Sequence, residues 1–341
     1  MFTQSKFTSS IDYMKILITG STGHLGEALV RTLSPQGHEI VAIDIQPSSF
    51  TTHVGNIANA TFVQRCMEGV DIVLHTATLH KPHVDTHSRQ EFIDTNITGT
   101  LQLLEAATAN KVRAFIFTST TSVFGDALIP PPGQPAAWIT EDVTPQPKNI
   151  YGVTKTAAED LCQLFHRNQK LPVLILRTSR FFPEQDDNKG MRDAFADDNL
   201  KALEYLYRRV DVEDVVSAHI AAMHKAPEIG FGKYIISATT PFTTADLPVL
   251  REHAPQIIKQ IYPEATNIFA QHNWQFLPKI DRVYVNEKAR RELHWQPQHD
   301  FGSLLQKLKQ GQSIKSKLAD MIGAKGYHSE SFSEGPYPVN H

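Results

Sequence analysis

A tyrosine and a lysine, Tyr151 and Lys155, occupy positions i and i+4 at the start of a segment with helical periodicity. Residues with this spacing share one face of a helix. An ammonium group close to a phenol favours the phenolate and lowers a pKa that is about 10 when unperturbed. Such a tyrosine can exchange a proton with a substrate hydroxyl near neutral pH. Because the pair alone is common, its meaning depends on the elements around it.

Five consecutive hydroxyl side chains follow the apolar run 114–117, and they precede the Tyr–Lys pair along the chain: Thr118, Ser119, Thr120, Thr121 and Ser122. The run has the composition of a strand that is buried on both faces. In an open parallel sheet the carboxyl ends of the strands face the ligand, so hydroxyls at this end would face a substrate. The alternative is a solvated Thr/Ser loop. The order of the two motifs favours a catalytic site.

A glycine-rich turn follows the first apolar run, 15–19, with glycines at Gly20, Gly23 and Gly26. We expect Gly20 to allow the tight turn out of the strand and Gly23 to let the backbone approach a pyrophosphate. Gly26 would let the next helix pack closely, with the phosphates at the N-terminus of that helix. An ordinary strand–turn–helix is the alternative, but the apolar helix and the second strand that follow favour dinucleotide binding.

The second predicted strand, 39–44, ends in Asp44, near the distance of about 20 residues at which an acid binds the adenosine ribose. A carboxylate there repels a 2′-phosphate, and residues 45–48 bring no positive charge. The sequence therefore predicts NAD rather than NADP as the cofactor. A turn or helix-cap aspartate is the alternative reading of Asp44.

Further apolar runs at 71–75, 173–177 and 234–237 alternate with helical segments, one of them over 92–110. This alternation predicts an α/β fold, a Rossmann doubly wound parallel sheet with a smaller C-terminal substrate lobe. Residues 126–149 hold six prolines and are expected to form a loop. The chain is predicted to divide into an extension, two lobes and a tail. Residues 1–13 form the extension, residues 14–180 with 209–238 the NAD-binding domain, and residues 181–208 with 239–314 the substrate lobe. The tail, residues 315–341, is expected to be partly disordered or docked on a partner subunit.

The composition of the 341 residues is that of a globular protein, with 41% hydrophobic and 20% charged residues and a net charge of −3. Nothing in it indicates a nucleic-acid or membrane partner, and the predicted compartment is the cytoplasm. Cys66 and Cys162 have no metal-ligand spacing. His80, His83 and His87 are interpreted as loop residues near the substrate entrance, so no metal is expected.

Together these motifs resemble the extended short-chain dehydrogenase/reductases, specifically the NAD-dependent sugar epimerase/dehydratase group. The resemblance covers about residues 14–310 and is strongest over 15–180, where the glycine triplet, Asp44, the segment from Thr118 to Gly125 and the Tyr–Lys pair occur in the family's order. It implies a catalytic set of Thr120, Tyr151 and Lys155, with Tyr151 as the base or acid. It also implies that Lys155 binds the nicotinamide ribose and holds down the tyrosine pKa.

The resemblance also implies ligand contacts. The implied cofactor residues are Gly20, Thr22, Gly23, His24, Leu25, Gly26, Asp44, Ile45, Asn56, Ile57, His75, Thr76, Ala77, Asn96, Thr118, Tyr151 and Lys155. The candidate substrate residues are Thr78, Lys81, Thr121, Arg180, Phe181 and Arg209. Arg180 could pair with a phosphate or carboxylate of a ligand, or with the acids that follow it in the chain.

The residues after Thr120 narrow the chemistry. Family members that dehydrate sugars commonly carry an acid there, whereas this chain has Thr121 and Ser122. The expected reaction is therefore epimerisation of a sugar or nucleotide sugar through a transient ketone. The alternatives are an NAD-dependent dehydrogenase or reductase of a small hydroxy or carboxylate-bearing substrate, and a non-catalytic NAD-binding scaffold. By analogy, helices beginning near Asn96 and Tyr151 would form a homodimer interface.

Overall fold

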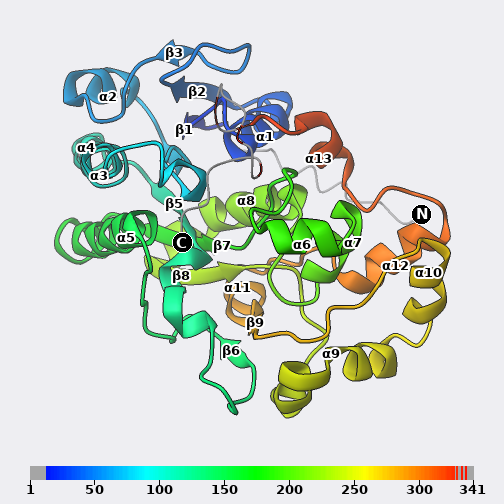
Figure 1. Cartoon of the computed structure of the whole chain (residues 1–341). Helices are drawn as coiled ribbons and strands as arrows, with labels where there is room; N and C mark the ends of the chain where they lie inside the picture. Colours follow the sequence, from blue (N-terminus) through cyan, green and yellow to red (C-terminus); the bar gives the residue numbers. More distant parts are fainter. Residues whose placement is uncertain (1–12, 327, 329–331, 333–334, 336–341) are drawn as a thin grey trace, which may run out of the picture.

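A seven-stranded parallel sheet forms the centre of the computed structural model, which describes residues 13–326, 328, 332 and 335. Its spatial order is β3-β2-β1-β4-β5-β7-β8 (Figure 1). The strands are β1 (Lys15–Thr19), β2 (Glu39–Asp44), β3 (His53–Val54), β4 (Ile72–His75), β5 (Ala114–Thr120), β7 (Val173–Thr178) and β8 (Phe231–Ile236). The predicted Rossmann sheet is confirmed. The sequence did not reveal β3, because two exposed residues carry no apolar pattern.

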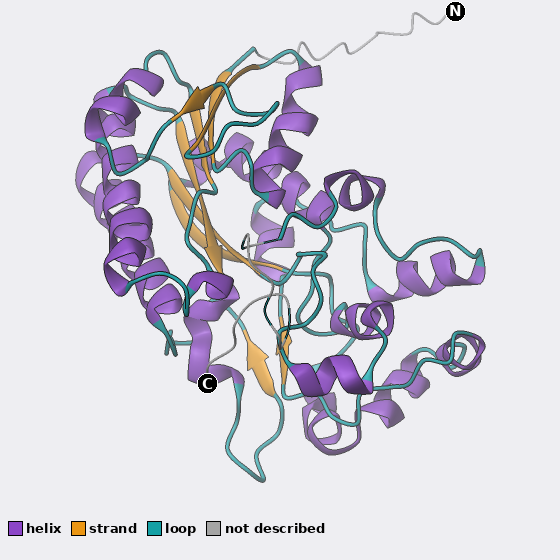
Figure 2. Cartoon of the chain, turned by 45° about the horizontal axis from the view of Figure 1, so that its top comes forward, coloured by secondary structure: helices purple, strands orange, loops and turns teal. Residues whose placement is uncertain are grey.

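Helices cover both faces of this sheet, as Figure 2 shows. One apolar core lies between the sheet and α1 (His24–Leu33), α8 (Val212–Ile229) and α13 (Lys317–Ile322). The core on the opposite face is formed with α2 (Ala60–Cys66), α4 (Gly99–Ala109) and α5 (Ile150–Gln169). Burial on both faces explains why the central strands are continuous apolar runs.

The helix predicted over 92–110 begins earlier and is not regular. It consists of α3 (Arg89–Ile93), a π-helical turn at Asp94–Thr98 and α4. Ser88 caps its start by accepting a hydrogen bond from the amide of Glu91. The irregular turn carries Asn96, and it thereby displaces this side chain relative to a continuous α-helix.

A second apolar core lies beside the sheet, below and to the right of it in Figure 1. It is built from α7 (Asp197–Glu204), α9 (Leu247–Ile261), α10 (Ala265–Gln271) and α12 (Phe301–Lys309), while α6 (Lys189–Ala194) lies nearby. Residues of α11 (Glu287–Glu292) and the segment after it, up to Trp295, pack into the sheet core instead. The segment 239–314, predicted to belong to a substrate lobe, therefore contributes to both apolar cores.

The proline-rich stretch 126–149 is not entirely a loop, and that prediction is corrected. Residues Ala137–Ile139 form β6, which pairs in parallel with β9 (Arg282–Tyr284). A 3₁₀ segment, Thr121–Leu128, precedes it, and further short 3₁₀ turns occur at Ser34–Gln36, Lys81–His83 and Thr244–Asp246. β6 went unrecognised because its partner is far away in sequence and only three residues pair.

The first part of the tail packs on its own chain. Leu318 and Ile322 of α13 are buried in the sheet core, and α13 contacts α1 and α8. The Ser316 hydroxyl donates to Asp211 Oδ1 at 2.5 Å. Most of the remaining tail and residues 1–12 of the predicted extension lie outside the described residues. No helix within the described ranges is both long and apolar enough to span a membrane.

A buried ion pair joins α5 to the sheet. Arg177 on β7 and Glu159 on α5 are 1% and 0% exposed, and Arg177 Nη2 lies 2.7 Å from Glu159 Oε2. The Ser119 hydroxyl of β5 donates to Glu159 Oε1 at 2.6 Å, and Lys233 of β8 lies 3.3 Å from Oε2. One carboxylate thus contacts three adjacent strands.

Replacing Arg177 with leucine should lower the free energy of unfolding by about 3–5 kcal/mol, because Glu159 would stay buried without its main counter-charge. Urea unfolding followed by circular dichroism measures this. In the matched control Arg291→Leu, where the arginine side chain is 62% exposed, the change should stay within about 0.5 kcal/mol. Equal losses in the two variants would contradict a structural role of the buried pair.

Candidate active site

A cleft of about 1010 Å³ runs from the glycine-rich turn, past the carboxyl ends of the strands, to β9. Its lining includes these residues predicted for the cofactor or the substrate: Gly20, Thr22, Gly23, His24, Leu25, Gly26, Asp44, Ile45, Asn56, Ile57, Thr76, Ala77, Thr78, Lys81, Thr118, Thr120, Thr121, Tyr151, Arg180 and Phe181. The glycine-rich turn and the Thr120–Tyr151 group therefore share one cavity. The sequence motifs converge at the sheet edge where an α/β fold binds its ligand.

The glycine-rich turn has the tight bend and the close helix packing that its sequence predicts. Gly20 has φ +74°, a conformation that L side chains rarely adopt, and its amide donates to the carbonyl of Ile43 at 2.8 Å. A Cβ at Gly26 would lie 1.9 Å from the carbonyl oxygen of Gly20, so only glycine permits this approach. Helix α1 begins at His24 and presents its N-terminus to the cleft. These features fit a pyrophosphate.

Asp44 ends β2 at the edge of the same cleft. Its Oδ2 accepts hydrogen bonds from the Thr22 amide at 3.0 Å and the Thr22 hydroxyl at 2.8 Å, and its Oδ1 accepts from the amide of Gln46. The carboxylate is thus held beside the glycine-rich turn. Its negative charge and position fit a cofactor with free ribose hydroxyls better than one with a 2′-phosphate.

Thr120 and Tyr151 come from different elements and meet at the cleft wall. Thr120 is the last residue of β5, and Tyr151 lies in the first turn of α5, which Asn149 caps by accepting from the Gly152 amide at 3.1 Å. Each is 8% exposed. Lys155 is not part of the lining; its ammonium donates to the carbonyl of Thr118 at 2.7 Å and lies 4.0 Å from the centre of the Phe117 ring.

The expectation that Lys155 lowers the pKa of Tyr151 is corrected. Burial raises the pKa of Tyr151 to about 12, and a hydrogen bond with Thr120 offsets only part of this effect. Burial also lowers the pKa of Lys155 to about 7. Both groups lose water on folding, and this disfavours the phenolate and the ammonium alike. Helical spacing predicted the shared face but could not predict how deeply the two groups are buried.

Besides Lys155, three residues that are predicted from the sequence to contact ligands lie behind the cleft wall instead. His75 hydrogen-bonds to the hydroxyls of Thr19 and Thr100 at 2.8 and 2.9 Å, and its burial lowers its pKa well below the ordinary value. The Asn96 carboxamide joins the segment after β4 to α5 by accepting from the amide of Leu79 and donating to the hydroxyl of Thr154. These are structural roles.

The third of these residues is Arg209, which pairs with buried Glu204 at 2.8 Å and donates to the carbonyl of Phe182. Arg180 does line the cleft, but its Nη1 lies 2.8 Å from Asp186 Oδ2 and 3.6 Å from Asp187 Oδ1. Arg180 was predicted to pair either with a ligand anion or with the acids that follow it, and in the structure it pairs with those acids. The charge at the substrate end is therefore largely balanced within the protein.

Sequence reasoning missed a part of the wall that the tail supplies. Lys325 and Gly326 line the cleft, the Lys325 amide donates to Glu184 Oε1 at 3.0 Å, and the Lys325 ammonium pairs with Glu27 of α1. The same Glu184 oxygen lies 2.8 Å from His24 Nε2. Burial opposes ionisation of Glu184, but His24 dominates and lowers its pKa to about 2. No local motif could reveal contacts across such sequence distances.

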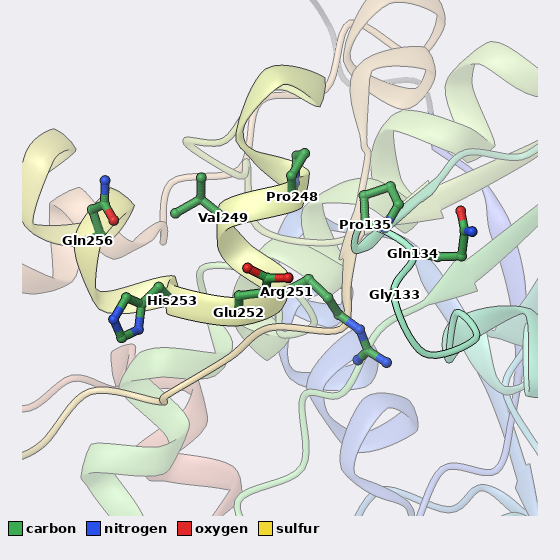
Figure 3. A pocket seen from close by; sticks show the side chains of 9 residues that line it. All are labelled: Gly133, Gln134, Pro135, Pro248, Val249, Arg251, Glu252, His253 and Gln256. Atoms are coloured by element: carbon green, nitrogen blue, oxygen red, sulfur yellow. The ribbon is translucent and has the colours of Figure 1, made fainter.

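Other unrecognised lining residues come from the substrate lobe, chiefly Arg208, Arg282 and Tyr284. His80, His83 and His87 lie in the wall as expected of loop residues near the entrance. A separate hollow lies between the loop 133–135 and α9 (Figure 3). Its arginine, Arg251, already pairs with Asp281, and none of the catalytic residues reaches it.

The family model "NAD dependent epimerase/dehydratase family" matches residues 16–236. The chain belongs to this family. It is 30% identical to the uncharacterized UDP-glucose epimerase YtcB of Bacillus subtilis over 48% of this chain, and it spans only 55% of that protein. It is 26% identical to the uronate dehydrogenase of Pseudomonas syringae over 58% of this chain and 71% of the relative.

The fold also matches solved structures. A short-chain dehydrogenase/reductase from Agrobacterium tumefaciens with bound NAD superposes with a TM-score of 0.61 at 21% identity, covering 90% of this chain and 99% of that one. This likeness shows that the two proteins share a fold. NAD is the family's cofactor, and the glycine-rich turn and Asp44 fit it.

The buried lysine of this epimerase/dehydratase family member should reduce stability at neutral pH. Folding lowers the pKa of Lys155 to about 7 from its ordinary value of 10.5, so the unfolded chain holds the proton more tightly, and stability from this group rises with pH between these values. Lys155→Met removes that cost. We expect it to stabilise the protein by about 1 kcal/mol at pH 7.

The gain should shrink as the pH rises toward 10, which urea unfolding between pH 6 and 9.5 can follow. Lys225→Met, which removes a lysine paired with exposed Glu228, is the control and should show no such pH dependence. A stability gain in Lys155→Met that does not change with pH would show that improved packing, not a deprotonation, is responsible.

Proposed function

We propose that the protein is an NAD-dependent epimerase of a sugar or nucleotide sugar that acts through a transient ketone. The observation that carries this proposal is the placement of Thr120 and Tyr151 on one wall of a cleft that also contains the glycine-rich turn. The residues after Thr120 lack a carboxyl group, which disfavours dehydration. The relatives named as UDP-sugar epimerases are in keeping with this choice.

In the proposed reaction Tyr151 acts as the phenolate, a form that a positive nicotinamide ring beside it would favour; it accepts the proton of the reacting hydroxyl and later returns it. Thr120 donates a hydrogen bond to the oxygen that becomes the carbonyl. Lys155 holds the backbone at Thr118, so that the end of β5 keeps its position against α5. NAD⁺, when bound, supplies a reversible hydride acceptor. A net oxidation would leave the ketone as product, whereas epimerisation returns the hydride to its other face.

Tyr151→Phe tests the role of the phenol. It should lower kcat by about 10² to 10⁴-fold, because the proton acceptor is lost while the shape of the ring is kept. Bound NAD, measured after gel filtration, should be unchanged. Tyr262→Phe, in the second core, is the matched control and should keep full activity. Equal activity of Tyr151→Phe and the wild type would refute the assignment.

Product analysis of the wild type separates the candidate functions. An epimer detected by NMR without net NADH absorbance supports the epimerase. Stoichiometric NADH accumulation supports the dehydrogenase alternative, and retained NAD without turnover of any sugar supports the scaffold. Failure to bind NAD would overturn all three.

We also propose a homodimer that uses α5 and the helical segment formed by α3, the π-helical turn and α4. Ile93, Val153 and Leu164 are large apolar residues exposed on these helices, by 36%, 46% and 36%. Leu164→Asp should convert the dimer to a monomer, as measured by light scattering on a gel-filtration column, without unfolding it. The control Ile261→Asp changes an equally exposed residue on α9 and should leave the dimer intact. A wild-type monomer would refute this proposal.

A further inference from the structure

Arg282 brings a positive charge without an acidic partner to the substrate end of the cleft. It is the first residue of β9 and part of the cleft lining. Its guanidinium carbon lies 5.9 Å from the ring centres of both Tyr207 and Tyr284. Its Nε is buried and has no hydrogen-bond partner among the residues that the structure describes. The charge is therefore positioned between aromatic rings and left unneutralised.

The neighbouring cations differ from Arg282 in this respect. Arg208 lies 3.1 Å from Asp186, and Lys148 lies 3.1 Å from Asp126. Lys81 pairs with Asp187, and Arg180 pairs with both Asp186 and Asp187. Within residues 13–326, no carboxylate lies within ion-pair distance of Arg282. Among the described residues at this end of the cleft, the guanidinium of Arg282 is thus the one without a carboxylate partner.

Arg282 is held on regular structure and not on a free loop. β9 pairs with β6, with Arg282 opposite Ala137. The amide of Tyr284 donates to the carbonyl of Tyr207 at 3.0 Å, and the amide of Val285 donates to the carbonyl of Ile139 at 3.0 Å. A guanidinium fixed in this way can present its planar donor group in one direction. This is the arrangement that a specificity-determining residue requires.

A carboxylate is the anion that fits this group best. Guanidinium and carboxylate form parallel N–H···O bonds with matched planar geometry, and each carries a single charge. A diphosphate would bring more negative charge than one free guanidinium balances, and the other cations here are already paired. A substrate carboxylate would pair with the two terminal nitrogens of Arg282, because Nε is closed off from solvent.

We propose that Arg282 binds a carboxylate of the substrate, so that the reacting sugar is a sugar acid, either free or linked to a nucleotide. The proposal rests on the function proposed above, because Thr120 and Tyr151 at the same cleft would act on a hydroxyl carbon of the bound acid. Arg282 sets substrate choice, whereas the proton transfer belongs to Tyr151.

The first test is binding, which does not depend on turnover. Titration calorimetry of the NAD-loaded protein would compare glucuronate with glucose and UDP-glucuronate with UDP-glucose. We expect each acid to bind at least 10-fold more tightly than its neutral counterpart. Arg282→Gln should remove that preference, and Arg282→Lys should retain part of it. The free and nucleotide-linked pairs show which form of the acid the cleft takes.

Arg290→Gln is the matched control. Arg290 Nε is also buried without a partner, but this residue does not line the cleft, so the substitution should leave the preference unchanged. Catalysis gives a second readout: in Arg282→Gln, kcat/KM should fall about 10- to 100-fold for the acid and stay the same for the neutral sugar.

The two proposals can fail separately. Equal binding of acid and neutral sugars by the wild type, or a preference that survives Arg282→Gln, would overturn the role of Arg282 while leaving the epimerase proposal intact. Acid binding that depends on Arg282, without turnover of any sugar, would support the carboxylate site and refute the proposed catalysis.

Discussion

The position of the cleft wall that carries Thr120 and Tyr151 depends on one buried carboxylate. Glu159 of α5 accepts from Ser119 of β5 and Arg177 of β7 and lies near Lys233 of β8. Burial alone would raise the pKa of Glu159, but its bonds to Arg177 prevail and keep the pKa below its ordinary value. The charge is therefore retained in the core. Because Glu159 and Tyr151 belong to the same helix, this anchor fixes Tyr151 relative to the end of β5.

Different physical features shape the two halves of the cleft. The cofactor half is shaped by backbone geometry, since Gly20 turns with a positive φ and Gly26 leaves room for the carbonyl of Gly20. The substrate half is shaped by charge, with Arg180 and Arg208 bound to Asp186 and Arg282 left without a carboxylate among the described residues. Backbone geometry constrains the shape of a ligand, whereas an unpaired charge selects its chemistry.

The sequence predicted those features whose cause is local. Buried strands are apolar runs, and the glycine turn, the residues after β5 and the Tyr–Lys spacing each lie within a few consecutive residues. It did not predict the contacts that join distant segments, such as Glu184 with Lys325 or the pairing of β6 with β9. Local spacing also could not distinguish a ligand contact from a buried structural bond. For that reason the sequence predicts His75, Asn96, Lys155 and Arg209 as ligand contacts, although none of them lines the cleft.

The pKa shifts of Tyr151 and Lys155 indicate that bound ligands, and not folding alone, set the charges at this site. Burial makes the phenolate of Tyr151 and the ammonium of Lys155 unfavourable, so folding alone does not prepare an ionised pair. A positive charge brought beside Tyr151 would lower the pKa of the phenol, and a negative charge beside Arg282 would neutralise the guanidinium. A site of this kind gains from binding a cation at one end and an anion at the other. The protonation state of Tyr151 therefore depends on the charge of the ligand that lies beside it.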